Sequence, residues 1–101
     1  MQYPEKMQLG GTVVTVNIVD TPITQFDSGA AIIGSYTPVG RVITQYHKDA
    51  HKEQCAESFV HETIEAIDSV YDLKLPHQTI TTLAAALYQA YSTGGVSFTE
   101  H

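Results

Sequence analysis

The chain has 101 residues, 43% of them apolar, and its formal net charge is −6 with only five lysines and arginines. This length and composition predict one globular domain with a modest core, which we expect to span residues 1–101, and they exclude a disordered chain. No apolar run approaches the roughly 18 residues that cross a membrane, and the few dispersed cations argue against a nucleic-acid partner or an anionic membrane surface.

The lack of a membrane-spanning run and of a secretory signal makes a soluble cytoplasmic protein the default expectation. Residues 1–10 lack the basic start and the long apolar stretch of a secretory signal. Cys55 is the only cysteine, so an internal disulfide and a multi-cysteine zinc site are both excluded. We expect its thiol to be buried and inert, because a helical cysteine usually packs as a small hydrophobic residue.

The N-terminal half of the chain predicts a small sheet. Residues 1–10 are expected to be a loose lead-in that ends at two glycines. Residues 12–19 alternate in the manner of a strand, and a polar loop follows them. A weaker strand is expected over 30–36, a turn with an early proline and a late glycine over 37–40, and a third strand over 41–46, which makes a hairpin.

The C-terminal half predicts two helices. Asp49 is expected to cap a long helix that runs to about Asp72, with its apolar residues on one broad arc. Pro76 suits the first position of a second helix, which ends near the glycines of residues 92–95. Strands first and helices after predict an α+β fold, with a three-stranded antiparallel sheet followed by two helices.

A narrow polar stripe on the first of these helices carries the segment His61-Glu62-Thr63-Ile64-Glu65. Side chains four residues apart on a helix lie about 6 Å apart, so His61 and Glu65 can reach one metal ion. His77 follows a short turn at the start of the next helix, where the helix dipole favours the neutral imidazole that binds metal. Two His and one Glu form a known zinc triad with a fourth position left for water.

Other interpretations of the same residues remain open. The polar stripe is also compatible with an ordinary solvent-exposed face of an amphipathic helix. His47, His51 and His101 are expected to be surface residues. Besides a catalytic zinc site, the chain is compatible with a metal-stabilised regulatory or interaction module without turnover. A third interpretation is a metal-free acidic domain that binds a protein partner.

Three stretches carry a resemblance to a known family. Residues 59–68 read FVHETIEAID, residues 75–78 read LPHQ and residues 86–89 read ALYQ. They resemble the minimal zinc metallopeptidases of phages and prophages, small relatives of the ImmA/IrrE peptidases, which typically read Leu-Leu-His-Glu-x-x-His-Ala-Ile-Asp, then Leu-Ser-Glu-Glu, then Gly-Leu-Tyr-Gln. The resemblance covers residues 9–91 and is strongest over 59–91.

The chain departs from that family pattern at two positions. Glu65 stands where the second His of the usual motif lies, and His77 stands where the usual downstream Glu ligand lies. The two exchanges compensate, so the set is still two His and one Glu. The signature is thus a HExxE…H variant of the gluzincin HExxH…E motif.

The resemblance implies a minimal zincin-like core that hydrolyses a peptide bond with one zinc ion per chain. His61, Glu65 and His77 would hold the zinc, and Glu62 would act as general base on a zinc-bound water. The substrate would be a peptide or protein, in the bacterial host cytoplasm if the chain is encoded by a phage.

Three further roles are expected around this site. Asp68 would hold a ligating imidazole by a hydrogen bond, and Tyr88, which recurs in the family pattern, would donate one to a developing oxyanion. Residues 42–46 would offer a strand edge to an extended peptide. Exposed edges of so small a sheet also make a homo-oligomer an open expectation.

Overall fold

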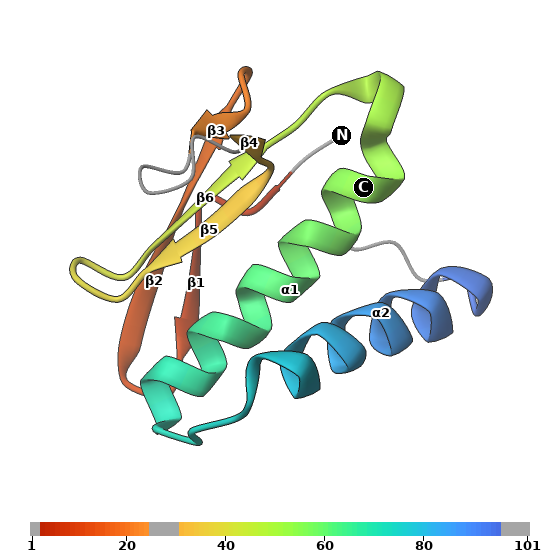
Figure 1. Cartoon of the computed structure of the whole chain (residues 1–101). Coiled ribbons are helices and arrows are strands. Elements are labelled where there is room, and N and C mark those ends of the chain that lie inside the picture. Colours follow the sequence, from red (N-terminus) through yellow and green to blue (C-terminus); the bar gives the residue numbers. More distant parts are fainter. Residues whose placement is uncertain (1–2, 25–30, 96–101) are drawn as a thin grey trace.

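The computed structural model describes residues 3–24 and 31–95, which fold as a sheet with one helix, α1, against one of its faces and a second helix, α2, on the far side of α1 (Figure 1). The α+β class predicted from the sequence is confirmed. Among the described residues, neither helix has the length and apolar character that crossing a bilayer requires. The elements are β1 Lys6–Leu9, β2 Thr12–Val19, β3 Ile23–Thr24, β4 Ala31–Ile32, β5 Gly34–Thr37, β6 Val42–Tyr46, a short 3-10 helix Asp49–His51, α1 Lys52–Tyr71 and α2 His77–Thr93.

The main sheet has four strands in the order β1-β2-β6-β5, so the predicted three-stranded antiparallel sheet is wrong in detail. β2 and β6 run parallel, with Val16 opposite Ile43, whereas the β1–β2 and β5–β6 pairs are antiparallel. Parallel neighbours need a long crossover, and the chain between β2 and β6 supplies one. β3 and β4 lie in that segment and form a separate two-stranded sheet.

Part of the segment expected to be a loose lead-in forms the edge strand β1. Lys6–Leu9 pairs with the start of β2 through a tight turn at Gly10 and Gly11. Gly10 has a φ of 60°, the left-handed region that glycine adopts without steric cost. The sequence pattern misses this strand because its four residues contain only two apolar positions, Met7 and Leu9.

The helix boundaries agree closely with prediction, but the expected cap does not form. The chain makes a 3-10 turn before α1 begins at Lys52, and no side chain caps either N-terminus. The Asp49 carboxylate instead contacts His47 Nε2 at 3.0 Å. Pro76 precedes the first residue of α2 rather than occupying it.

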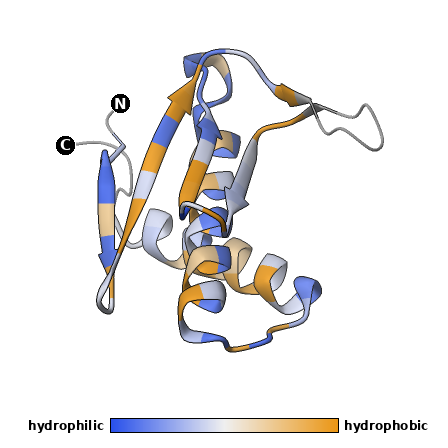
Figure 2. Cartoon of the chain, turned by 90° about the vertical axis from the view of Figure 1, so that its left-hand side faces the viewer, coloured by the Kyte–Doolittle hydropathy of each residue, from blue (hydrophilic) through white to orange (hydrophobic). Residues whose placement is uncertain are grey.

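The core lies on both sides of α1. Val14, Val16 and Ile43 of the sheet pack against Phe59 and Ala66 of α1. On its other side, α1 packs against α2 through a second cluster, made of Val60, Ile64, Ile80 and Ala84. Hydrophobic residues accordingly recur along β2 and along both helices (Figure 2). Cys55 is fully buried, as expected.

Candidate metal centre and adjoining groove

The three predicted ligands converge where α1 and α2 meet. His61 Nε2 lies 3.7 Å from Glu65 Oε1, and His77 Nδ1 lies 3.7 Å from the same oxygen. The two imidazole rings are 5.4 Å apart between centroids. One ligand atom from each residue lies within 4.8 Å of the others, so this group could hold a metal ion.

Local geometry of the α1–α2 linker explains why His77 reaches this point. Asp72 and Lys74 both have φ above 50°, in the left-handed region, and so reverse the chain sharply. The Leu75 N–H donates to Asp68 Oδ1 at 2.8 Å, and the Leu75 side chain packs against the α1–α2 cluster. Asp68, expected to orient a ligating imidazole, thus contacts the linker that delivers His77.

The surroundings of His61 favour the form of its imidazole that binds a metal ion. Burial is the main cause of a lowered pKa at His61, helped by His77 and opposed by Glu65 and Glu57. A lowered pKa favours the neutral imidazole, which is the form that binds metal. The His61 and Glu65 side chains are 20% and 31% exposed, whereas that of His77 is 78% exposed. The site is therefore open to solvent on its α2 side.

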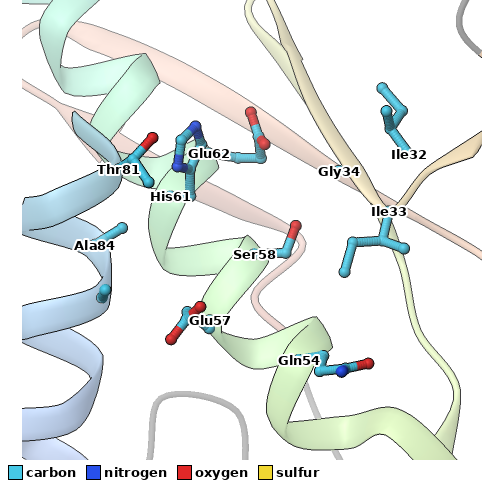
Figure 3. A pocket seen from close by; sticks show the side chains of 11 residues that line it. Ile32, Ile33, Gly34, Gln54, Glu57, Ser58, His61, Glu62, Thr81 and Ala84 are labelled. Carbon is cyan, nitrogen blue, oxygen red and sulfur yellow. The ribbon is translucent and has the colours of Figure 1, made fainter. Parts of the chain in front are cut away.

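Glu62 is a buried carboxyl beside this group. Only 8% of it is exposed, and burial, with a smaller contribution from the charge of Glu65, raises its pKa to about 7. In Figure 3 its carboxyl lies on the Gly34 side of α1, whereas His61 points towards α2. A carboxyl that titrates near neutral pH can both accept and return a proton.

A groove of about 530 Å³ runs along α1 beside His61 and Glu62 (Figure 3). That volume lies within the range typical of ligand pockets. Its floor comes from α1, one wall from the strand segment over residues 32–34 and the other wall from α2. The lining residues are Ile32, Ile33, Gly34, Gln54, Glu57, Ser58, His61, Glu62, Thr81, Ala84 and Ala85.

The strand edge nearest this groove is β5. Residues 42–46 were expected to offer the edge, which is wrong because β6 lies between β2 and β5 in the sheet. β5 ends the strand order and is antiparallel to β6. Its first residue, Gly34, lines the groove.

The sequence analysis missed Gly34, which lines the groove, and Gln45, which is the partner of Gly34 on the neighbouring strand. A Cβ at Gly34 would lie 2.5 Å from Ser58 Oγ, 2.8 Å from Gln45 Oε1 and 3.1 Å from Glu62 Cγ. Glycine therefore allows β5 to approach α1 closely. The buried Gln45 amide donates to the carbonyls of Ile33 and Tyr46, while its Oε1 has no hydrogen-bond partner among the described residues. The signals available in the sequence were a glycine and a glutamine within predicted strands, which could have indicated a close backbone approach and a buried polar side chain.

Tyr88 is not brought to the ligand group. It follows His77 by eleven residues on α2, which corresponds to roughly 16 Å of helical rise. Its ring packs against the cluster between the two helices. This placement leaves the expected hydrogen bond to an oxyanion without structural support.

The other histidines differ in their surroundings. His47 was expected at the surface, but its side chain is only 15% exposed, and its Nδ1 is 2.9 Å from the Tyr3 hydroxyl. Tyr3 also packs edge-on against Phe59, so this contact holds the N-terminal segment to α1. His51 is exposed as expected, and His101 lies outside the described residues.

Comparison of the chain with protein-family models, with curated proteins and with solved structures finds no significant match.

Proposed function

We propose that the chain is a zinc-dependent peptidase. The observation that carries this proposal is the convergence of His61, Glu65 and His77, with ligand atoms within 4.8 Å of one another, beside a groove that contains the buried Glu62. Two His and one Glu is a ligand set typical of catalytic zinc. The resemblance of residues 59–91 to the minimal phage and prophage metallopeptidases supports the same function, in the bacterial host cytoplasm if the chain is encoded by a phage.

The chemistry divides between the ion and the side chains around it. Zinc held by the triad would supply a water whose pKa is lowered towards about 7. Glu62, adjacent to His61 and with its pKa raised to about 7, would accept a proton from the attacking water. The water oxygen would add to the peptide carbonyl carbon, and Glu62 would return the proton to the nitrogen as the C–N bond breaks.

The groove and the β5 edge hold the substrate in this proposal. An extended peptide adds to β5 as a further antiparallel or parallel strand, with main-chain hydrogen bonds that do not depend on its sequence. Its backbone then lies above α1, with the scissile bond next to His61 and Glu62. Residues of the strand segment over 32–34 and of α2 enclose its side chains.

A second candidate function is a metal-stabilised interaction module without turnover. Two observations favour this module. The His77 side chain is largely exposed, and α2 has only two buried residues, so an ion bound by His77, His61 and Glu65 would stabilise the packing of α2 against α1. This function needs the three ligands but does not need Glu62.

One experiment separates the two functions. Zinc-loaded wild type and Glu62→Gln are incubated with a diverse peptide mixture, and the products are identified by mass spectrometry. The peptidase proposal predicts cleavage by the wild type, at least about 100-fold slower cleavage by Glu62→Gln, and the same zinc content in both. Glu53→Gln, an exposed carboxylate earlier on α1, is the matched control and should cleave normally.

Equal cleavage by wild type and Glu62→Gln would contradict the assignment of Glu62 as general base. A wild type that binds zinc and cleaves no peptide would favour the interaction module.

A further inference from the structure

We propose that the groove selects peptides with a lysine or arginine side chain close to the scissile bond, and that Glu57 recognises the positive charge. This inference rests on the proposed peptidase function and names the substrate class of the same groove. It follows from the charge of the groove lining, from its apolar walls and from the distance between Glu57 and the ligand group.

The groove lining carries negative charge without any cation. Its charged residues are Glu57 and Glu62, and none of the lysines or the arginine of the described chain lines it. Glu62 is buried with a raised pKa, whereas Glu57 is exposed and lies one helical turn before His61. Glu57 is therefore the carboxylate available to a ligand in the groove, in a chain of net charge −6.

The walls of the groove suit the aliphatic stem of a basic side chain. Ile32 and Ile33 lie on the strand side, and Ala84 and Ala85 lie on the α2 side. Figure 3 shows Ile33 and Ala84 on opposite sides of α1. Lysine and arginine bury their methylene groups against apolar surface while the charged end stays solvated or paired. A groove with these apolar wall residues and one exposed carboxylate matches this pattern better than it matches an acidic or a purely apolar side chain.

The distances place Glu57 within reach of such a side chain. His61 and Glu57 are four residues apart on α1, which corresponds to about 6 Å along the helix axis. A flexible four-carbon stem can extend over this distance from a residue whose carbonyl lies at the ligand group. Glu57 also interacts electrostatically with His61, which agrees with their placement on neighbouring turns of one side of the helix.

The test measures binding, so that it does not depend on turnover. Zinc-loaded Glu62→Gln protein is titrated into fluorescein-labelled hexapeptides of alanine with one lysine at successive positions. Matched series carry norleucine, which has a similar stem without the charge, or glutamate. At the best position we expect lysine to bind about fivefold tighter than norleucine, the upper range for an exposed ion pair, and glutamate to bind weakest.

Variants of the two exposed α1 carboxylates identify the residue responsible. Adding Glu57→Gln should remove the preference for lysine over norleucine, and adding Glu57→Lys should make the glutamate peptide bind best. Glu53→Gln, one turn earlier on α1 and outside the groove lining, should keep the preference. Raising the salt concentration should reduce the preference, because salt screens an exposed charge pair.

Equal binding of the lysine and norleucine series at every position would overturn the inference, as would a preference that survives Glu57→Gln. Failure of the proposed function looks different. A lysine preference that depends on Glu57, in a wild type that cleaves no peptide, would support recognition of a basic side chain by Glu57 and contradict the peptidase. Cleavage that depends on Glu62 but shows no basic preference would contradict this inference alone.

Discussion

The two helices differ sharply in how firmly they are attached. α1 is packed on both sides and has seven buried residues, whereas α2 has two, Ile80 and Ala84. Large apolar residues of α2 stay substantially exposed, among them Leu83 at 46% and Leu87 at 37%. The proposed ligands divide between these helices, since His61 and Glu65 lie on α1 and His77 begins α2. A bound ion would thus join a firmly packed element to a loosely packed one.

The largest expected effect contrasts the two packing surfaces directly. Phe59→Ala removes a ring between α1 and the sheet and should lower the free energy of unfolding by about 3–5 kcal/mol. Leu87→Ala, on the partly exposed face of α2, should lower it by less than about 1 kcal/mol. Urea denaturation followed by circular dichroism measures both. Similar losses in the two variants would refute the contrast.

A pH effect should arise from Glu62 on the sheet side of α1. In the folded chain its pKa is raised from 4.5 to about 7, so folding favours its neutral form. The free energy of unfolding of the metal-free protein should therefore fall by on the order of 3 kcal/mol as pH rises from 4.5 to 7. At higher pH it should stay constant. Urea titrations in chelator check this. Glu62→Gln should lack the decline, and an identical pH profile in that variant would exclude Glu62 as its source.

Close contact between β5 and α1 predicts a moderate effect at Gly34. Gly34→Ala places a methyl group against Ser58 and Gln45 and should lower the free energy of unfolding by about 1–3 kcal/mol. Gly11→Ala is the control, because a Cβ there has nothing within 4 Å. Thermal unfolding of both variants measures the difference. If the two variants unfolded at the same temperature, β5 and α1 would be less closely packed than described.

The smallest predicted effect lies in the linker between the helices. Asp68→Ala removes the acceptor of the Leu75 N–H and should cost about 1 kcal/mol, with a zinc affinity reduced about tenfold. Isothermal titration with zinc measures the affinity, and Ser69→Ala, an exposed neighbour, serves as control. An unchanged affinity in Asp68→Ala would show that the linker does not position His77.

The parts of the site that follow from local geometry could be predicted from the sequence. His61 and Glu65 are one helical turn apart, so the helix period alone places them together. His77 follows a linker so short that the chain must reverse beside the end of α1. These two facts account for the ligand group before any packing is considered.

The parts that depend on non-local pairing could not be predicted. Whether β5 or β6 lies at the sheet edge is decided by a parallel pairing across a long crossover, and nothing in the strand sequences specifies it. The close approach at Gly34 and the burial of Gln45 follow from the same pairing. Tyr88 was predicted from a family pattern, but it lies eleven residues after His77 on the same helix and is therefore far from the ligand group.

Zinc content tests the central claim most directly. Wild type, His77→Ala and His51→Ala are purified without an affinity tag, dialysed against zinc and then against buffer, and analysed by elemental mass spectrometry. His51 is an exposed histidine outside the ligand group and serves as the matched control. We predict about one zinc per chain in the wild type and in His51→Ala, and its loss in His77→Ala. No zinc in the wild type, or zinc retained by His77→Ala, would contradict the metal centre.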